Sequence, residues 1–283
     1  MTQDIVIIPT FDRPEFLWMC LDNLMHVYGI ADKMIWVTED IHADKPKNFT
    51  TQWEMLCTIR EASRKFGSNF RYIATHPHTT YGNSFNVLSA LAEAAVRGSG
   101  SVYLIEDDAL VTEDFFRWNE EVQRNFSPWA SCAGRLNRSL NFHMNGPEAI
   151  DESIKDLNAC HTSKNAYMSW ATCFSKQAIQ DIASMANNFE HFRPGFEQDI
   201  MIQNHIRRNK LQTVWPYVPR AYHMGWYSYH RNGGMKLEGS LEERVKSLKS
   251  IVKCPAKLRA VAGAQDDMTA FRSTEAASTL YLR

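Results

Sequence analysis

The stretch Ser101-Val-Tyr-Leu-Ile-Glu106-Asp107-Asp108-Ala-Leu-Val-Thr-Glu-Asp-Phe-Phe116 decides the fold of this chain. Four residues that favour β-structure lead directly into three acids, and an amphipathic segment without glycine or proline follows. A buried strand that ends in adjacent carboxylates gathers oxygen ligands, which hard divalent cations prefer. We therefore predict a cation site at a strand end, where open α/β sheets bind ligands, and such a cation would hold a diphosphate. An exposed acidic turn is the alternative.

The chain before this stretch alternates between short apolar runs and amphipathic segments. The pattern predicts strands at 4–9, 33–38, 69–74 and 101–106, with helices at 14–28, 51–66 and 84–97. Such alternation is typical of a parallel, Rossmann-like sheet. No G-x-G-x-x-G follows the first strand, where the turn reads Pro9-Thr-Phe-Asp-Arg-Pro14, and no P-loop occurs. The sequence therefore argues against a dinucleotide-binding protein.

The second half of the chain has a weaker pattern. Residues 127–150 are rich in Ser, Asn, Gly and Pro and predict an irregular connection with one strand near 130–135. Further strands are expected at 167–174 and 211–218, and helices at 175–187, 197–209 and 241–252. Residues 222–234 form an aromatic, glycine-containing segment that could close over a ligand. The tail after residue 260 gives no clear signal.

The composition is that of a globular protein with an uneven distribution of charge. The 283 residues are 44% hydrophobic and 22% charged, with a net charge of −1. Residues 190–260 contain thirteen Lys and Arg against six Asp and Glu, which suits a polyanionic partner or a solvated helical face. The six cysteines form no C-x-x-C pair, and no apolar run reaches the roughly 20 residues of a membrane helix. We expect a cytosolic protein without a membrane anchor.

Two further groups of residues could carry chemistry. Glu197-Gln-Asp199 opens a predicted helix, where either acid could serve as a general base or merely stabilise the helix dipole. His223, in the aromatic segment, could bind a metal ion, although a single histidine is often only hydrogen-bonded. No H-E-x-x-H and no G-x-S-x-G motif occurs, so neither a zinc protease nor an α/β-hydrolase is indicated.

Together these pieces resemble a GT-A glycosyltransferase, and most of all the N-acetylglucosaminyltransferase I family. The most specific likeness is Ile105-Glu-Asp-Asp108 through Asp114-Phe-Phe116, which is similar to the family signature E-D-D-L-x-x-x-x-D-F-F. The other matching stretches are Ile8-Pro-Thr-Phe-Asp-Arg13 with Cys20-Leu-Asp-Asn-Leu24, then Val37-Thr-Glu-Asp40, and Arg220-Ala-Tyr-His-Met-Gly225. The likeness spans residues 5–234 with gaps.

The resemblance implies a GT-A fold, with a mostly parallel, Rossmann-like central sheet flanked by helices. Residues 1–125 would form the nucleotide-sugar-binding half, residues 126–260 the acceptor and catalytic half, and residues 261–283 a tail. Asp108 would bind Mn²⁺ or Mg²⁺, with His223 as a further candidate ligand. Asp199 would be the catalytic base, with Glu197 as its rival. The donor-binding residues implied are Pro9, Thr10, Arg13, Asp40, Asn86, Glu106, Asp107 and Trp170, of which Asn86 stands where the family has a base-contacting histidine.

The implied activity is metal-dependent, inverting transfer of a sugar, of the hexosyltransferase type, from a nucleotide-sugar such as a UDP-sugar to an acceptor hydroxyl. The missing anchor and the basic second half favour a microbial or viral enzyme, acting in the host cytosol where it is viral. Its acceptor would be a glycan or a hydroxymethylated base in DNA. A sugar nucleotidyltransferase, or a non-catalytic sugar- or nucleic-acid-binding module, are the alternatives. The sequence specifies neither the sugar nor the oligomeric state.

Overall fold

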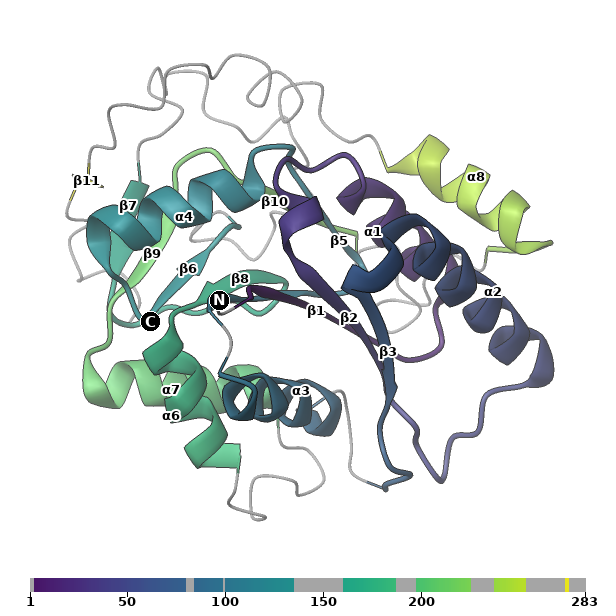
Figure 1. Cartoon of the computed structure of the whole chain (residues 1–283), viewed down its shortest axis with the longest axis horizontal. Helices are drawn as coiled ribbons and strands as arrows, with labels where there is room; N and C mark the ends of the chain where they lie inside the picture. Colours follow the sequence, from purple (N-terminus) through teal and green to yellow (C-terminus); the bar gives the residue numbers. More distant parts are fainter. Residues whose placement is uncertain are drawn as a thin grey trace.

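The computed structural model describes residues 3–79, 84–98, 100–134, 160–186, 197–224, 237–252 and 273–274. Its centre is a nine-stranded sheet with the strand order β11-β7-β9-β6-β8-β4-β1-β2-β3, covered by helices on both faces (Figure 1). The fold is therefore mixed α/β with a mostly parallel sheet, as the sequence predicts. None of the helices in the described part of the chain is long and apolar enough to cross a membrane.

The first half of the chain builds the parallel part of the sheet. β4, β1, β2 and β3 lie side by side and all run in the same direction. Fully buried β-branched and aromatic residues make the inner strands suitable for a sheet covered on both faces. The elements are β1 (Ile5–Thr10), α1 (Pro14–Leu24), β2 (Met34–Glu39), α2 (Phe49–Phe66), β3 (Phe70–Ala74), α3 (Ser84–Val96) and β4 (Val102–Ile105), with 3₁₀ turns at Ile30–Asp32 and Gly67–Asn69.

The second half extends the sheet with mixed strand directions. β8 is antiparallel to both β4 and β6, β7 is antiparallel to β9, and the pairs β6–β9 and β11–β7 are parallel. The elements here are β5 (Ala109–Val111), α4 (Phe115–Phe126), β6 (Ala130–Cys132), β7 (Cys160–Ser163), β8 (Ala171–Phe174), α6 (Lys176–Ala186), α7 (Gln198–Asn209), β9 (Thr213–Pro216), β10 (Ala221–His223), α8 (Leu241–Ile251) and β11 (Ser273–Thr274).

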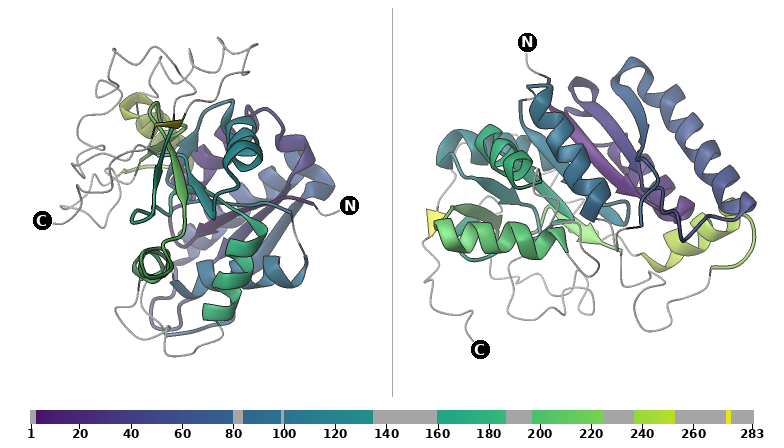
Figure 2. Two further views of the ribbon diagram at one scale, coloured as in Figure 1. Left: turned by 90° about the vertical axis from the view of Figure 1, so that its left-hand side faces the viewer. Right: turned by 90° about the horizontal axis from the view of Figure 1, so that it is seen from below.

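Helices lie on both faces of the sheet, as Figures 1 and 2 show, and an apolar layer holds them on each face. On one face, α1, α2 and α4 pack on the strands through a cluster that includes Leu17, Ile59 and Trp118. On the other face, α3, α6 and α7 pack through a cluster that includes Leu88 and Ile202. Consecutive strands and helices thus bury their apolar sides on both faces of one sheet, which leaves the strand ends to form the site.

Several predicted element boundaries are wrong by a few residues. The first helix ends at Leu24 rather than near residue 28, and the strand expected at 167–174 begins only at Ala171. The strand expected at 211–218 covers Thr213–Pro216, and Pro216 closes it instead of interrupting it. Strands β5, β7 and β10 were not predicted, because they have only three or four residues and the last two also contain polar residues. Most of the predicted aromatic segment, residues 225–234, lies outside the described residues, as do most of the irregular connection and of the tail.

Strands β5 and β10 form a separate two-stranded antiparallel ribbon. Ala221 lies opposite Val111, Tyr222 opposite Leu110, and His223 opposite Ala109. The ribbon carries a residue from late in the chain to the position directly after the acidic triplet.

Candidate functional site

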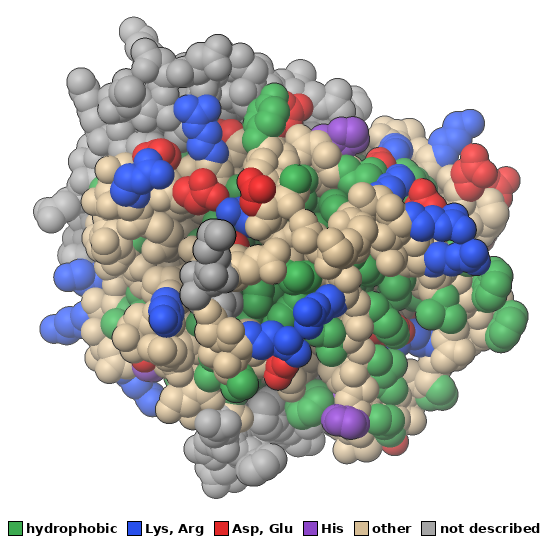
Figure 3. Space-filling view, in the orientation of Figure 1, with side chains coloured by type: hydrophobic (Ala, Val, Ile, Leu, Met, Phe, Trp, Pro, Cys, Tyr) green, Lys and Arg blue, Asp and Glu red, His purple; other side chains and the backbone are tan. Residues whose placement is uncertain are grey.

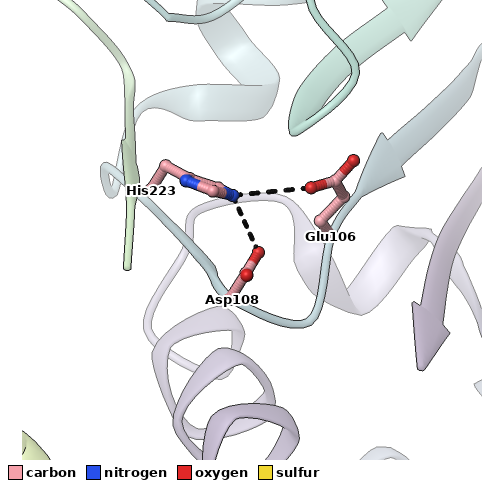
Figure 4. Close-up of side chains that lie close together, drawn as sticks. All are labelled: Glu106, Asp108 and His223. Carbon is pink, nitrogen blue, oxygen red and sulfur yellow. Dashed lines mark ion pairs between the residues drawn. The ribbon is translucent and has the colours of Figure 1, made fainter. Parts of the chain in front are cut away.

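Glu106, Asp108 and His223 form a cluster at the carboxyl end of β4. Each of them offers one ligand atom, and these atoms lie within 4.8 Å of one another (Figure 4). The Nε2 atom of His223 is 3.0 Å from Oδ1 of Asp108 and 3.5 Å from Oε2 of Glu106. The structure thus brings together two of the three predicted acids and the predicted histidine.

Asp107, the middle acid, is turned away from this cluster toward the end of β1. The hydroxyl of Thr10 donates to Oδ2 of Asp107 over 2.8 Å. The guanidinium of Arg13 donates to Asp107 with one nitrogen and to Oδ2 of Asp108 with the other, the latter over 2.7 Å. Arg13 therefore bridges two carboxylates that would otherwise repel each other.

The cluster perturbs the pKa values of its members. Burial would raise the pKa of Asp108, but Arg13 and His223 outweigh it and hold this pKa well below its ordinary value. Burial would lower the pKa of His223, but Asp108 and Glu106 raise it to about 9. Burial also raises the pKa of Asp107, against the effect of Arg13. At neutral pH, without a cation, Asp108 is therefore ionised beside a protonated imidazole.

Asp199, the predicted base, lies in the first turn of α7 close to this cluster. Burial, followed by the charges of Glu106 and Glu197, raises the pKa of Asp199 to about 7. Its Oδ1 atom is buried and has no hydrogen-bond partner in the described part of the chain. Glu197, the other candidate for the base, is exposed. It occupies the N-cap position of α7, but its side chain makes no capping hydrogen bond. A carboxylate with this pKa can both release and accept a proton near neutral pH.

Trp170 contacts the cluster from the position directly before β8, the strand that neighbours β4. Its ring lies 4.8 Å from that of His223, with an interplanar angle of 35°. The backbone carbonyl of Trp170 also accepts a hydrogen bond of 2.9 Å from the amide of Glu106. Trp170 thus forms an apolar wall beside the imidazole.

Two other predicted donor-binding residues, Asp40 and Asn86, lie near the ends of β1 and β2. Asp40 is almost fully buried and is bonded to Nε2 of His78. Asn86 donates to the carbonyl of Thr38 over 2.7 Å and, more weakly, to that of Thr10 over 3.5 Å. Pro9 precedes Thr10 inside β1 and lies opposite Thr38. These residues surround the same sheet edge as the acidic cluster.

A cavity of about 550 Å³ lies between β3 and α3 beside these residues. Thr38 and Asn86 are part of its wall. The Oγ1 atom of Thr38 and the Oδ1 atom of Asn86 are buried and have no hydrogen-bond partner in the described structure. Phe85 and Arg71 also line it. Figure 3 shows hydrophobic side chains next to Lys and Arg side chains over this part of the molecule. The size suits a small organic ligand.

Sequence reasoning missed two polar residues near the site. The hydroxyl of Ser169 donates to Oε1 of Glu106 over 2.7 Å and fixes that carboxylate. The hydroxyl of Tyr167 is buried, and burial together with the charge of Asp199 raises its pKa. Both lie just before β8 in Tyr167-Met-Ser169-Trp170, and the only signal in the sequence was the predicted tryptophan beside them.

Comparisons with known proteins give similarity of structure only. No protein-family model matches the chain, and no curated protein matches it in sequence. The structure is similar to that of S. aureus TarS 1-349 in complex with UDP-GlcNAc, with a TM-score of 0.49 and 11% identity over 75% of this chain and 55% of TarS 1-349. It is also similar to galactosyltransferase LgtC in complex with donor and acceptor sugar analogs, with a TM-score of 0.45 and 10% identity over 91% of this chain and 99% of LgtC.

The chain therefore spans about half the length of the TarS fragment that it matches. Similarity of this extent concerns the course of the chain and not its chemistry. The narrower resemblance to the N-acetylglucosaminyltransferase I family stays a prediction.

Proposed function

We propose that this protein is a metal-dependent glycosyltransferase that moves a sugar from a nucleotide-sugar, with UDP as the expected nucleotide, to an acceptor hydroxyl. The observation that carries the proposal is the placement of Glu106, Asp108 and His223 within ligand distance of one another. Asp199, a carboxylate with a pKa of about 7, lies within electrostatic reach of them. A cation site beside a candidate base, at the carboxyl ends of the strands of an α/β sheet, suits sugar transfer from a diphosphate donor.

The candidate metal ligands fit Mn²⁺ or Mg²⁺. Carboxylate oxygens suit both ions, and an imidazole nitrogen suits Mn²⁺ in particular. The Oδ1 atom of Asp108 is buried and faces the Nε2 atom of His223 at 3.0 Å, so a cation that displaced the imidazole proton could bind to both atoms. Asp108, Glu106 and His223 would hold the ion, and when bound it would neutralise the charge of the leaving diphosphate.

The chain's own residues would then divide the remaining work. Arg13 can exchange one of its carboxylate partners for a phosphate oxygen, since its fork-shaped guanidinium suits both groups. Asp199 would accept the proton of the acceptor hydroxyl as that oxygen attacks the anomeric carbon, and a single displacement of this kind inverts the configuration. Trp170 would pack against the transferred sugar, since its ring forms the apolar wall of the cluster.

The cavity between β3 and α3 is the proposed place for the base of the donor. Its two unpaired oxygens, on Thr38 and Asn86, can bond the polar edge of a pyrimidine ring. Asp40 lies at the same edge, at the end of β2. A base held here would direct its phosphates toward Arg13 and the carboxylates.

The acceptor is proposed to be a hydroxymethylated base in DNA, with a glycan as the other candidate. Exposed cations at the end of α7, namely Arg207, Arg208 and Lys210, support a polyanionic acceptor. A sugar nucleotidyltransferase is less well supported, because no glycine-rich loop follows β1.

A thermal-shift panel tests the donor and the metal together. Nucleoside diphosphates and nucleotide-sugars are added with Mn²⁺, with Mg²⁺ or with EDTA. We expect UDP or a UDP-sugar to raise Tm only when the metal is present, because binding to the folded state stabilises it. Asp108→Asn should abolish the metal-dependent part. An equal rise of Tm for all nucleotides in EDTA would contradict the proposal.

Transfer itself is tested with radiolabelled donors and two matched duplexes, one that contains hydroxymethylated pyrimidines and one that does not. We expect label only on the modified duplex, and binding to DNA that weakens as salt increases. Asp199→Asn should abolish transfer while donor binding persists, whereas Glu197→Gln should retain most of the activity. Labelling of glycans but not of DNA would refute the DNA acceptor and support the glycan acceptor. Labelling of neither would refute the proposed transferase activity.

A further inference from the structure

The ribbon of β5 and β10 is too short to define its own register. It has three residue pairs and, within the described structure, no third strand. Two-stranded ribbons are marginally stable without further support. A slip by one residue would move every side chain of β10 to the other face, so that the imidazole of His223 would point away from the carboxylates.

A buried ion pair fixes one end of this ribbon. The Nε atom of Arg220 donates to Oδ2 of Asp114 over 2.9 Å, and another nitrogen of its guanidinium donates to the carbonyl of Val218 over 2.6 Å. The hydroxyl of Thr112 donates to Oδ1 of Asp114 over 2.5 Å. Arg220 is 0% exposed and Asp114 is 3% exposed, so neither charge has water as an alternative partner.

Backbone hydrogen bonds continue beyond both ends of the ribbon. The amide of Thr112 donates to the carbonyl of Arg220 over 3.0 Å, directly before the first residue pair. The amide of Arg220 donates over 2.7 Å to the carbonyl of Ala133, just after β6. At the far end, the amide of Met224 donates to the carbonyl of Asp108 over 2.6 Å. Arg220 therefore lies directly before β10 and three residues before His223, and the other end of β10 meets Asp108, the candidate metal ligand.

Apolar packing is the competing explanation for the register. Leu110, Tyr222 and Met224 bury their side chains in a cluster with Phe16 and Leu248. Apolar contacts are less directional than a charged pair, and Tyr222 and Met224 are spaced so that a slip of two residues would again bury large apolar groups. The ion pair, in contrast, has one geometry.

We propose that Asp114 and Arg220 are positioning residues, whose ion pair sets the register of β10 and thereby holds His223 against Asp108 and Glu106. This inference rests on the proposed metal site. It gives Asp114, the acid of the D-F-F stretch, a task that its distance in sequence from the acidic triplet does not reveal.

The experiment measures Mn²⁺ affinity by calorimetry at a temperature at which each full-length variant is folded by circular dichroism. We expect Asp114→Asn and Arg220→Lys to weaken Mn²⁺ binding by about 10- to 100-fold, the usual effect of losing a residue that orients a ligand. His223→Gln should weaken it by a similar factor. Lys33→Met is the matched control. Lys33 lies before β2 and forms a partly buried ion pair with Asp4, at the amino ends of the parallel strands and away from the cluster. This variant should bind Mn²⁺ as the wild type does.

A second variant covers the case in which the single changes prevent folding. Asp114→Leu combined with Arg220→Met removes both charges at once, which is often tolerated in a buried pair. We expect a folded protein whose Mn²⁺ affinity is still reduced at least 10-fold. Affinity equal to that of the wild type, in this double variant or in a folded Asp114→Asn, would overturn the inference and leave apolar packing as the cause of the register.

A separate readout distinguishes this inference from the proposed function. The side-chain ¹⁵N signals of His223, identified with His223→Gln, are recorded at one fixed pH without metal. In Asp114→Asn they should move toward the values of exposed histidines, whereas in Lys33→Met they should not. If the wild type binds no Mn²⁺ but these signals still move, the metal site fails and the positioning role stands. If Mn²⁺ binds and they do not move, the positioning role fails alone.

Discussion

Replacing Asp199 by asparagine should stabilise the folded protein, and the gain in stability should increase as pH rises. Burial, with the charges of Glu106 and Glu197, raises the pKa of Asp199 from 3.8 to about 7. Between pH 4 and pH 7 the folded state therefore binds a proton that the unfolded state has lost, so the contribution of this group to stability decreases as pH rises through that window. Asparagine resembles the protonated acid and avoids this loss.

The magnitude follows from the two pKa values. At 1.36 kcal/mol per pH unit, the difference between 3.8 and about 7 corresponds to about 4 kcal/mol. The side chain is partly exposed, and solvent screening reduces the expected gain to about 2–4 kcal/mol at pH 8. At pH 5, about 1.2 pH units above the unfolded-state pKa of 3.8, the unfolded state has lost its proton while the folded state keeps it. The same arithmetic gives a gain of about 1.6 kcal/mol, which screening reduces to about 1 kcal/mol.

Urea denaturation of the two proteins at pH 5 and pH 8, in EDTA, measures this difference. Effects of other titrating groups cancel because they are common to both proteins. Glu197→Gln is the control, since it removes one nearby charge and should recover a smaller part of the same gain. A difference between Asp199→Asn and the wild type that is the same at both pH values would refute the assignment of Asp199 as a buried carboxylate with a raised pKa.

Three further predictions concern single residues. Arg13→Met should lower the free energy of unfolding of the metal-free protein by about 3 kcal/mol, because it leaves two adjacent carboxylates without their shared cation, and should enlarge the rise of Tm caused by Mn²⁺ in a thermal-shift assay. An unchanged response to Mn²⁺ would argue against a cation site here. Lys33→Met should cost about 1–3 kcal/mol in urea denaturation while UDP affinity, measured by calorimetry, stays constant. Asn48→Ala removes the N-cap of α2 and should cost about 1 kcal/mol, whereas Asn48→Asp should cost little in the same measurement.

Most of the parallel half of the sheet could be predicted because its inner strands are continuous runs of apolar, β-favouring residues. Ile5–Thr10 and Val102–Ile105 are buried throughout, so their apolar runs are continuous and easily recognised. The polar strand Cys160–Ser163 gives no such signal, and the antiparallel position of β8 beside β4 depends on strand order, which residue patterns do not encode.

The candidate site, too, could be predicted only in part. Adjacent acids at a strand end predicted a cation site, and the structure places Glu106 and Asp108 where one can form. That Asp107 turns instead to Thr10 and Arg13 could not be predicted, because alternation along an irregular segment after a strand follows no fixed period. The roles of Ser169 and Tyr167 depend on contacts with Glu106 and Asp199, residues that are distant from them in sequence.

The separate ribbon of β5 and β10 also bears on how the protein folds. Its two strands are more than a hundred residues apart in the chain, so pairing them closes a long loop and carries a large entropic cost. Since contacts of such separation are slow to form, we expect this pairing to follow the formation of the parallel half, whose β-α units are local in sequence. A nascent or partly unfolded chain would therefore hold the acids of β4 without their histidine, and competence to bind a cation should be among the last properties that the protein acquires.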